Sequence, residues 1–190
     1  MKKELLSKVY QHPLISSQEL HTLIDAHHKV MLKKGDYVLE KGQIANEYMV
    51  LESGLMRSFA YDYRGNDITT DFFCNFDVVI EVLSLFQRTK SEENIQAITD
   101  CVGWRIDFDT FQELFHAIDG FSEWGRLWMT GRLFYFKQRS IDMVTISAKD
   151  RYLQLIETKP QVVQHAPLKY IASFLGITDT SLSRIRKEIF

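Results

Sequence analysis

Short runs of alternating apolar and polar residues, separated by glycines, constrain the fold of this chain more than any other feature. The runs lie between residues 29 and 73, and turn residues recur at roughly ten-residue spacing. The separating glycines are Gly35, Gly42, Gly54 and Gly65. Short strands joined by frequent turns are typical of a β-sandwich or β-barrel. A further strand pair is predicted over Asn94–Ile98 and Val102–Phe108, and then a short helix over Asp109–Ile118, capped by Asp109 or Thr110.

Helical periodicity precedes and follows this β region. Residues 1 to 28 have the pattern of amphipathic helix. A much longer helix is predicted from Phe121 to Val144, because apolar residues recur at i, i+3, i+4 and i+7 over several turns. Its apolar stripe, which we expect to contribute the dimer interface, comprises Trp124, Leu127, Trp128, Gly131, Phe134, Tyr135 and Ile141. The segment 145–148 breaks the pattern and is expected to act as a hinge before a further helix over Lys149–Glu157.

The long stripe has two interpretations, and we expect one for each of its edges. One edge packs on the β domain. The other forms a two-fold dimer seam, since Leu127, Phe134 and Ile141 recur every seven residues. Gly125 and Gly131 each weaken a helix by about 1 kcal/mol relative to alanine, so we expect a close approach of another backbone there.

The end of the sequence predicts two short helices around a sharp turn. Leu168, Ile171, Ala172 and Leu175 form one apolar stripe, and Pro167 suits the first turn of that helix. Gly176 favours the left-handed backbone that ends a helix, and Thr178 can cap the next one. The buried face of the second helix comprises Leu182, Ile185 and Ile189. This is the pattern of a helix-turn-helix, with Thr178–Lys187 as the recognition helix.

Polar residues off that apolar face favour DNA as the partner, although a purely structural hairpin has the same periodicity. Arg184 is the best candidate to donate two parallel hydrogen bonds to a guanine. Asp179 suits the positive end of the helix dipole. The other donors are Thr180, Ser181, Ser183 and Lys187, with Lys169 and Lys149 as possible phosphate contacts.

The charge and composition of the chain agree with a DNA-binding protein and argue against several other classes of protein. The net charge is −2, but from Ser147 onward seven Lys and Arg residues stand against four Asp and Glu residues. No apolar run is long enough to span a bilayer and the start lacks a secretory signal, so we expect a cytoplasmic protein. Two cysteines cannot hold an iron–sulfur cluster, and the histidines lack metal-site spacing. No catalytic motif occurs, so we do not expect an enzyme.

The order of these parts resembles the Crp/Fnr family of bacterial transcription regulators. The segments that carry the resemblance are KKGDYVLEKGQ, LESGLMR, NIQAITDC, SAKDRYLQLIETKP and PLKYIASFLGITDTSLSRIRKEI. The resemblance implies an α+β fold with a jelly-roll-like, double-stranded β-roll of the cyclic-nucleotide-binding type over residues 1–120. A dimerisation helix and hinge (121–146) and a helix-turn-helix domain (147–190) follow. It places Thr178, Asp179, Thr180 and Arg184 at the base-reading end and Ser181 nearer the phosphates. The implied partners are double-stranded DNA, a second copy of the chain and RNA polymerase, without a membrane.

The sequence departs from the family at the ligand site. Members that bind cyclic nucleotides carry F-G-E and then an arginine followed by small residues. Aligned without gaps on Ala97, this chain has Ile80-Glu81 and Ser91-Glu92-Glu93 instead. A buried cyclic phosphate needs a charge partner, so we expect no cAMP or cGMP binding. Arg88 lies three positions before the place of that arginine. It would bind a cyclic phosphate only if the loop were remodelled.

Two further expectations follow from this alignment. Glu81, Arg88 and Ser91 mark an effector pocket whose ligand cannot be read from the sequence, and Glu81 itself is expected to be a surface or salt-bridged acid. With Phe190 as the last residue, a full wing after the recognition helix is not expected.

The sequence therefore predicts a homodimeric, DNA-binding transcription regulator of the Crp/Fnr type without a cofactor. A small-molecule sensor or protein-interaction module without specific DNA binding stays open as the alternative.

Overall fold

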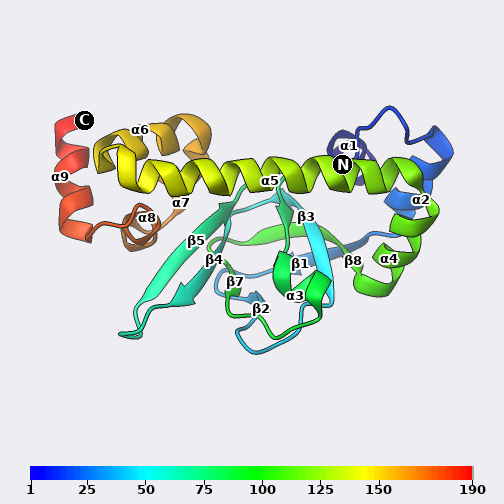
Figure 1. Ribbon diagram of the computed structural model, residues 1–190, viewed down its shortest axis with the longest axis horizontal. Coiled ribbons are helices and arrows are strands. Elements are labelled where there is room, and N and C mark those ends of the chain that lie inside the picture. The colour runs from blue at the N-terminus through cyan, green and yellow to red at the C-terminus, as the bar shows by residue number, and fades with distance from the viewer. Residues whose placement is uncertain (190) are drawn as a thin grey trace.

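The chain folds into a β-roll, a long helix that runs the length of the molecule, and a cluster of helices at one end (Figure 1). The structure is a computed structural model and describes residues 1–189. The prediction that no full wing follows the recognition helix depends on Phe190, and this residue lies outside the described residues. Within residues 1–189 no helix is long and apolar enough to cross a membrane.

Two four-stranded antiparallel sheets form the roll, which confirms the predicted α+β fold with a jelly-roll-like domain. In strand order, the first sheet contains β1 (His28–Leu32), β8 (Cys101–Asp107), β3 (Glu47–Ser53) and β6 (Val78–Val79). The second contains β2 (Tyr37–Leu39), β7 (Asn94–Ala97), β4 (Met56–Tyr61) and β5 (Asp67–Phe73). Large apolar residues such as Val50, Met56 and Phe73 fill the space inside the roll.

The strands predicted around residues 94–98 and 102–108 both form, but their pairing with each other was wrong. β7 pairs with β2 and β4, whereas β8 pairs with β1 and β3 in the other sheet. The chain changes sheets between them, where the N–H of Ile98 donates to the carbonyl of Leu55 at 2.8 Å. Gly54 makes this corner possible: its φ is +109°, and an added Cβ would lie 2.6 Å from the carbonyl oxygen of Asp100.

The helices follow the predicted order with small changes at their ends, except that a helix over Pro160–His165 was not predicted. α1 (Lys2–Val9) and α2 (Ser17–Asp25) precede the roll, and α3 (Val82–Gln87) is inserted in it. α4 (Phe108–Ala117) begins one residue earlier than predicted. Its cap is neither Asp109 nor Thr110 but Asp107, which accepts a 3.0 Å hydrogen bond from the N–H of Thr110. The remaining helices are α5 (Asp119–Thr145), α6 (Ala148–Thr158), α7 (Pro160–His165), α8 (Leu168–Phe174) and α9 (Asp179–Ile189).

Buried apolar residues form two clusters, and the second crosses from the roll to the C-terminal helices. The first cluster lies inside the roll and under α1, α2, α4 and the start of α5. The second combines Leu55, Phe72 and Ile98 of the roll with residues of the C-terminal helices. The latter are Tyr152, Leu155, Val162, Ile171, Ala172, Phe174, Leu175 and Leu182. The helix-turn-helix is therefore packed on the roll, not tethered beside it.

A buried histidine connects the N-terminal helices to the roll. The imidazole of His27 hydrogen-bonds the Leu23 carbonyl through Nδ1 at 2.7 Å and the Tyr10 hydroxyl through Nε2 at 2.8 Å. Tyr10 in turn shares a 2.9 Å hydrogen bond with the hydroxyl of Tyr48 on β3. Burial lowers the pKa of His27 from 6.5 to about 4, so the ring is neutral at pH 7.

This histidine predicts a loss of stability in mild acid. Between pH 6.5 and 4 the unfolded chain protonates His27 while the folded chain does not, so its stabilising contribution is present above pH 6.5 and is lost as the pH falls. We expect His27 to lower the free energy of unfolding by about 1.4 kcal/mol per pH unit there, and by about 3 kcal/mol in total.

Urea unfolding at pH 7.5, 6 and 5 measures this loss. The variant His27→Gln should show a shallower pH dependence, while substitution of the exposed His21 by glutamine should leave the wild-type dependence unchanged. Equal slopes for His27→Gln and the wild type would contradict the assignment.

Candidate functional site

The last two helices form the predicted helix-turn-helix geometry. Gly176 has φ of +68° in the turn. Thr178 precedes α9, and its Oγ1 accepts a 3.2 Å hydrogen bond from the N–H of Ser181, which is the predicted cap. Ala172 and Leu182 are both fully buried where α8 and α9 pack together. Pro167 lies one position earlier than predicted, as the N-cap of α8 and not in its first turn.

The polar face of α9 is open to solvent. Thr180, Ser183, Arg184 and Lys187 are exposed and follow the i, i+3, i+4, i+7 spacing of one helix face. Thr178 and Asp179 are exposed at its N-terminal end, and Lys169 is exposed on α8, whereas Ser181 is half-buried. Within residues 1–189, no hydrogen bond or ion pair engages the Arg184 side chain. Most of the predicted DNA-binding residues therefore lie on one accessible surface.

One edge of α5 is covered by the roll. The indole N–H of Trp124 donates to the carbonyl of Val9 at 2.7 Å, and its ring stacks on Phe121 and Trp128. Further along, Tyr135 donates to Asp71 on β5 at 3.3 Å. In the described chain Trp124, Trp128 and Tyr135 contact its own N-terminal and roll residues, and their contribution to a dimer interface stays a prediction.

The other edge of α5 is apolar and exposed. The exposed fractions of Leu127, Phe134 and Ile141 are 50%, 66% and 40%. Gly131 is also exposed, and an added Cβ would meet nothing within 4 Å in the described chain. At Gly125, by contrast, a Cβ would lie 2.5 Å from the Phe115 ring, so a close approach does occur, to a side chain and not to a backbone.

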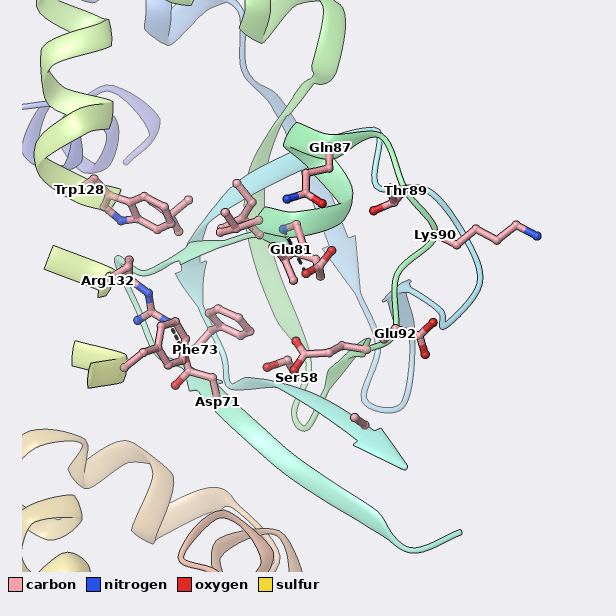
Figure 2. Close-up of a pocket in the computed structure, with 17 residues that line it drawn as sticks. Ser58, Asp71, Phe73, Glu81, Gln87, Thr89, Lys90, Glu92, Trp128 and Arg132 are labelled. Atoms are coloured by element: carbon pink, nitrogen blue, oxygen red, sulfur yellow. Dashed lines mark hydrogen bonds and ion pairs between the residues drawn. The ribbon is translucent and has the colours of Figure 1, made fainter. Parts of the chain in front are cut away.

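A cavity of about 500 Å³ lies between the roll and α5 (Figure 2). Phe73, Val78 and Trp128 provide apolar walls, and Arg132 reaches the cavity from α5. Its lining includes four acids (Asp71, Glu81, Glu92 and Glu93) but only two basic residues, Lys90 and Arg132. Burial raises the pKa of Glu93 above its ordinary value.

Only one of the three predicted pocket residues lines this cavity. Glu81 does, but it is neither a free surface acid nor a salt-bridged one: it caps α3, accepting from the N–H groups of Leu83 and Ser84 at 3.3 and 2.5 Å. Arg88 lies outside the cavity lining and donates to the carbonyl of Ala45 at 2.6 Å. Ser91 is buried, and its hydroxyl donates to the carbonyl of Glu93 at 2.8 Å.

Residues 29–117 match the family model described as the cyclic nucleotide-binding domain. These residues include both sheets except for one residue of β1. The long helix and the C-terminal helices follow this domain along the chain. The chain has the Crp/Fnr fold.

Solved structures with this Crp/Fnr fold match over most of the chain. FixK2 from Bradyrhizobium japonicum is 14% identical, covers 86% of this chain and 84% of its own, and has a TM-score of 0.73. The c-di-GMP responsive global regulator CLP of Xanthomonas campestris is 15% identical, with 92% and 91% covered and a TM-score of 0.68.

A kinase regulatory subunit matches a smaller share of the chain. The regulatory subunit of a cAMP-independent protein kinase A from Trypanosoma brucei is 18% identical and has a TM-score of 0.54. That match covers 60% of this chain and 42% of the subunit. No curated protein sequence matches the chain.

Two charged residues at the junction between the roll and the rest of this Crp/Fnr-fold chain were missed from the sequence. The first is Asp71 on β5, whose side chain is only 3% exposed. It accepts hydrogen bonds from Arg132 and Tyr135 of α5, and Lys159, at the start of α7, lies 3.5 Å from it. Asp71 thus joins the cavity wall, the long helix and the C-terminal helices.

The second is Arg57 on β4. It donates two hydrogen bonds to Asp67 at 2.9 and 2.8 Å, which lower the pKa of that carboxyl. Its guanidinium lies between two rings, 4.0 Å from the centroid of Phe59 and 3.4 Å from that of Tyr170 on α8. Arg57 therefore ties the roll to the first helix of the helix-turn-helix. A charged residue inside a predicted strand is the only signal that the sequence offers for either residue.

Proposed function

We propose that this protein is a homodimeric, sequence-specific DNA-binding transcription regulator that acts in the cytoplasm. The observation that carries the proposal is the open polar face of α9, capped by Thr178 and supported by α8. The exposed edge of α5 supports the dimer, because its apolar residues recur at the seven-residue spacing of a helical seam. RNA polymerase follows as a partner of such a regulator.

In the proposed complex each protomer places α9 in a major groove. Two-fold symmetry then requires a pseudo-palindromic site whose halves lie about 34 Å apart. Thr178, Thr180 and Arg184 face the base edges, and Ser183 and Lys187 lie further along the same face toward the phosphates. Arg184 has the fork of donors that matches guanine O6 and N7.

We also propose that the regulator does not respond to cAMP or cGMP. The cavity lining carries more acids than bases, and Ser91 stands where the family resemblance would place the phosphate-binding arginine. Arg88 does not replace that arginine, since its guanidinium is bound to the carbonyl of Ala45 and to Asn46 at 2.6 and 2.5 Å. A cyclic phosphate in the cavity would lack a dedicated charge partner.

Selection of bound sequences from a random duplex pool, with and without added cAMP, tests both proposals. We expect enrichment of a pseudo-palindrome that is the same in both arms. No enrichment at any salt concentration would contradict DNA recognition and favour a sensor or protein-interaction module. Enrichment that depends on cAMP would contradict the proposal about the ligand.

Substitution of Arg184 by alanine should weaken binding to the selected site by about 1–3 kcal/mol and relax the preference at one base pair. Fluorescence anisotropy with the selected site and with single-base variants measures both effects. The exposed Arg105 on β8 provides a matched control, and Arg105→Ala should bind as the wild type does. Wild-type affinity for Arg184→Ala would contradict the role of this residue.

A further inference from the structure

A wide groove separates the turn of the β4–β5 hairpin from the start of the recognition helix. Tyr61, Gly65 and Asn66 line it on the hairpin side, and Gly176, Thr178 and Asp179 line it on the α9 side. Its volume is about 910 Å³. Figure 1 shows the hairpin projecting from the roll toward the end of the molecule that carries α8 and α9. The groove is thus continuous with the proposed DNA-binding surface.

The hairpin is fixed relative to the recognition helix by contacts between β4–β5 and α8. The N–H of Thr69 donates to the Ser173 hydroxyl at 3.1 Å, and the rings of Phe72 and Phe174 lie 5.1 Å apart. The stacking of Arg57 on Tyr170 adds a third contact. A molecule bound by α9 therefore meets the hairpin turn at a defined position.

The chemistry of the turn suits a phosphate backbone. Arg64 is exposed at the tip beside Tyr63, which is 88% exposed, and its guanidinium lies 5.0 Å from the Tyr63 ring centroid. The two acidic residues near Arg64 already have partners within the chain. Asp62 accepts hydrogen bonds from the N–H groups of Arg64 and Asn66 at 2.8 and 2.9 Å, and Asp67 is paired with Arg57.

The α9 side of the groove complements this arrangement. Lys169 of α8 is exposed and lines the groove. Asp179 is the one acid of the lining without an ion pair in residues 1–189, and it lies in the first turn of α9, where the helix dipole offsets its charge. Arg64 and Lys169 thus give this region positive charge next to the helix that is to enter the major groove.

We propose that the β4–β5 turn is a second DNA contact, in which Arg64 binds the sugar–phosphate backbone that borders the major groove occupied by α9. This proposal rests on the proposed function, because it places the DNA by means of the recognition helix. A contact to phosphates adds affinity without base preference. The roll would then hold DNA directly, in addition to positioning the helix-turn-helix.

Salt-dependent binding of the full chain to the selected site tests the proposal. We expect Arg64→Ala to weaken binding about tenfold at 0.1 M salt and to reduce the slope of log K against log salt by about two, one for each protomer. The base preference should not change, and an unrelated duplex should lose affinity in the same proportion. Lys3→Ala, on α1 at the opposite end of the molecule, is the matched control and should behave as the wild type does.

The outcomes separate this inference from the proposed function. Wild-type affinity and wild-type salt slope for Arg64→Ala and for the charge reversal Arg64→Glu, with normal site selection by the parent, would overturn the hairpin contact alone. Failure of the parent to select any site would overturn the proposed function. Hydroxyl-radical footprinting adds a direct readout: backbone positions protected by the wild type should become open with Arg64→Ala, and an unchanged footprint would count against the contact.

Discussion

Replacement of Arg57 by alanine is expected to lower the free energy of unfolding by about 3–5 kcal/mol, the range for breaking a buried ion pair. The side chain is 1% exposed and is among the largest fully buried side chains of the roll. Its loss would leave Asp67 without its cation and the Thr69 hydroxyl without a 3.1 Å donor. It would also open a space between the rings of Phe59 and Tyr170.

Urea denaturation of the full chain measures this change. Arg57→Lys keeps the charge but loses the two-pronged hydrogen bond and the stacking, so its loss should be smaller than that of alanine. Tyr170→Leu, alone and combined with Arg57→Ala, gives the coupling energy of the stack. Arg105→Ala removes an exposed pair with Glu47 and should cost less than 1 kcal/mol. A loss of less than 1 kcal/mol for Arg57→Ala would show that Arg57 does not hold the roll and α8 together.

Substitution of Phe134 by glutamate should convert the proposed dimer into a monomer and weaken binding to the palindromic site by two to four orders of magnitude. Phe134 lies in the middle of the exposed edge of α5, one heptad from both Leu127 and Ile141. A carboxylate buried in an apolar seam would be strongly unfavourable. Two linked recognition helices gain about 10²–10⁴ in apparent affinity from their high effective concentration, and a monomer loses that gain.

Analytical ultracentrifugation and anisotropy on the same samples test this prediction. Because Phe134 is already exposed in the single chain, the fold should be retained, which circular dichroism can verify. Met31→Glu, at an exposed position of β1, is the control and should stay dimeric. A dimeric Phe134→Glu variant with wild-type affinity would place the dimer interface elsewhere.

Local interactions explain why parts of this fold could be predicted from the sequence. The turn at Gly176 and the cap at Thr178 depend on neighbours within a few residues, so their residue types were sufficient to locate them. The alternating runs between residues 29 and 73 likewise indicated strands. They could not indicate strand partners: β7 and β8 are separated by three residues, and a corner directs them into different sheets.

The charged residues at the junction of the roll and helices required three-dimensional information. Asp71 follows Thr70 on β5, and the sequence around it does not show that α5 and Lys159 bury its carboxylate and neutralise its charge. Arg88 was misjudged for a related reason. It ends α3 with a left-handed backbone, and its side chain is directed to the residues around Ala45. A gap-free alignment carries no information about such a turn.

Leu55 and Phe72 of the roll share a buried apolar cluster with the C-terminal helices. This cluster limits where the chain can be divided into fragments. A chain cut after Thr145 would expose Phe72 and leave Asp71 without Lys159, and the released helices would expose Phe174 and Leu175. A chimaera that joins this roll to a foreign helix-turn-helix would have to supply an aromatic partner for Arg57 and, beside Arg132, a second cation for Asp71. Recombination between such regulators should therefore succeed only when the crossover transfers both sides of this surface together.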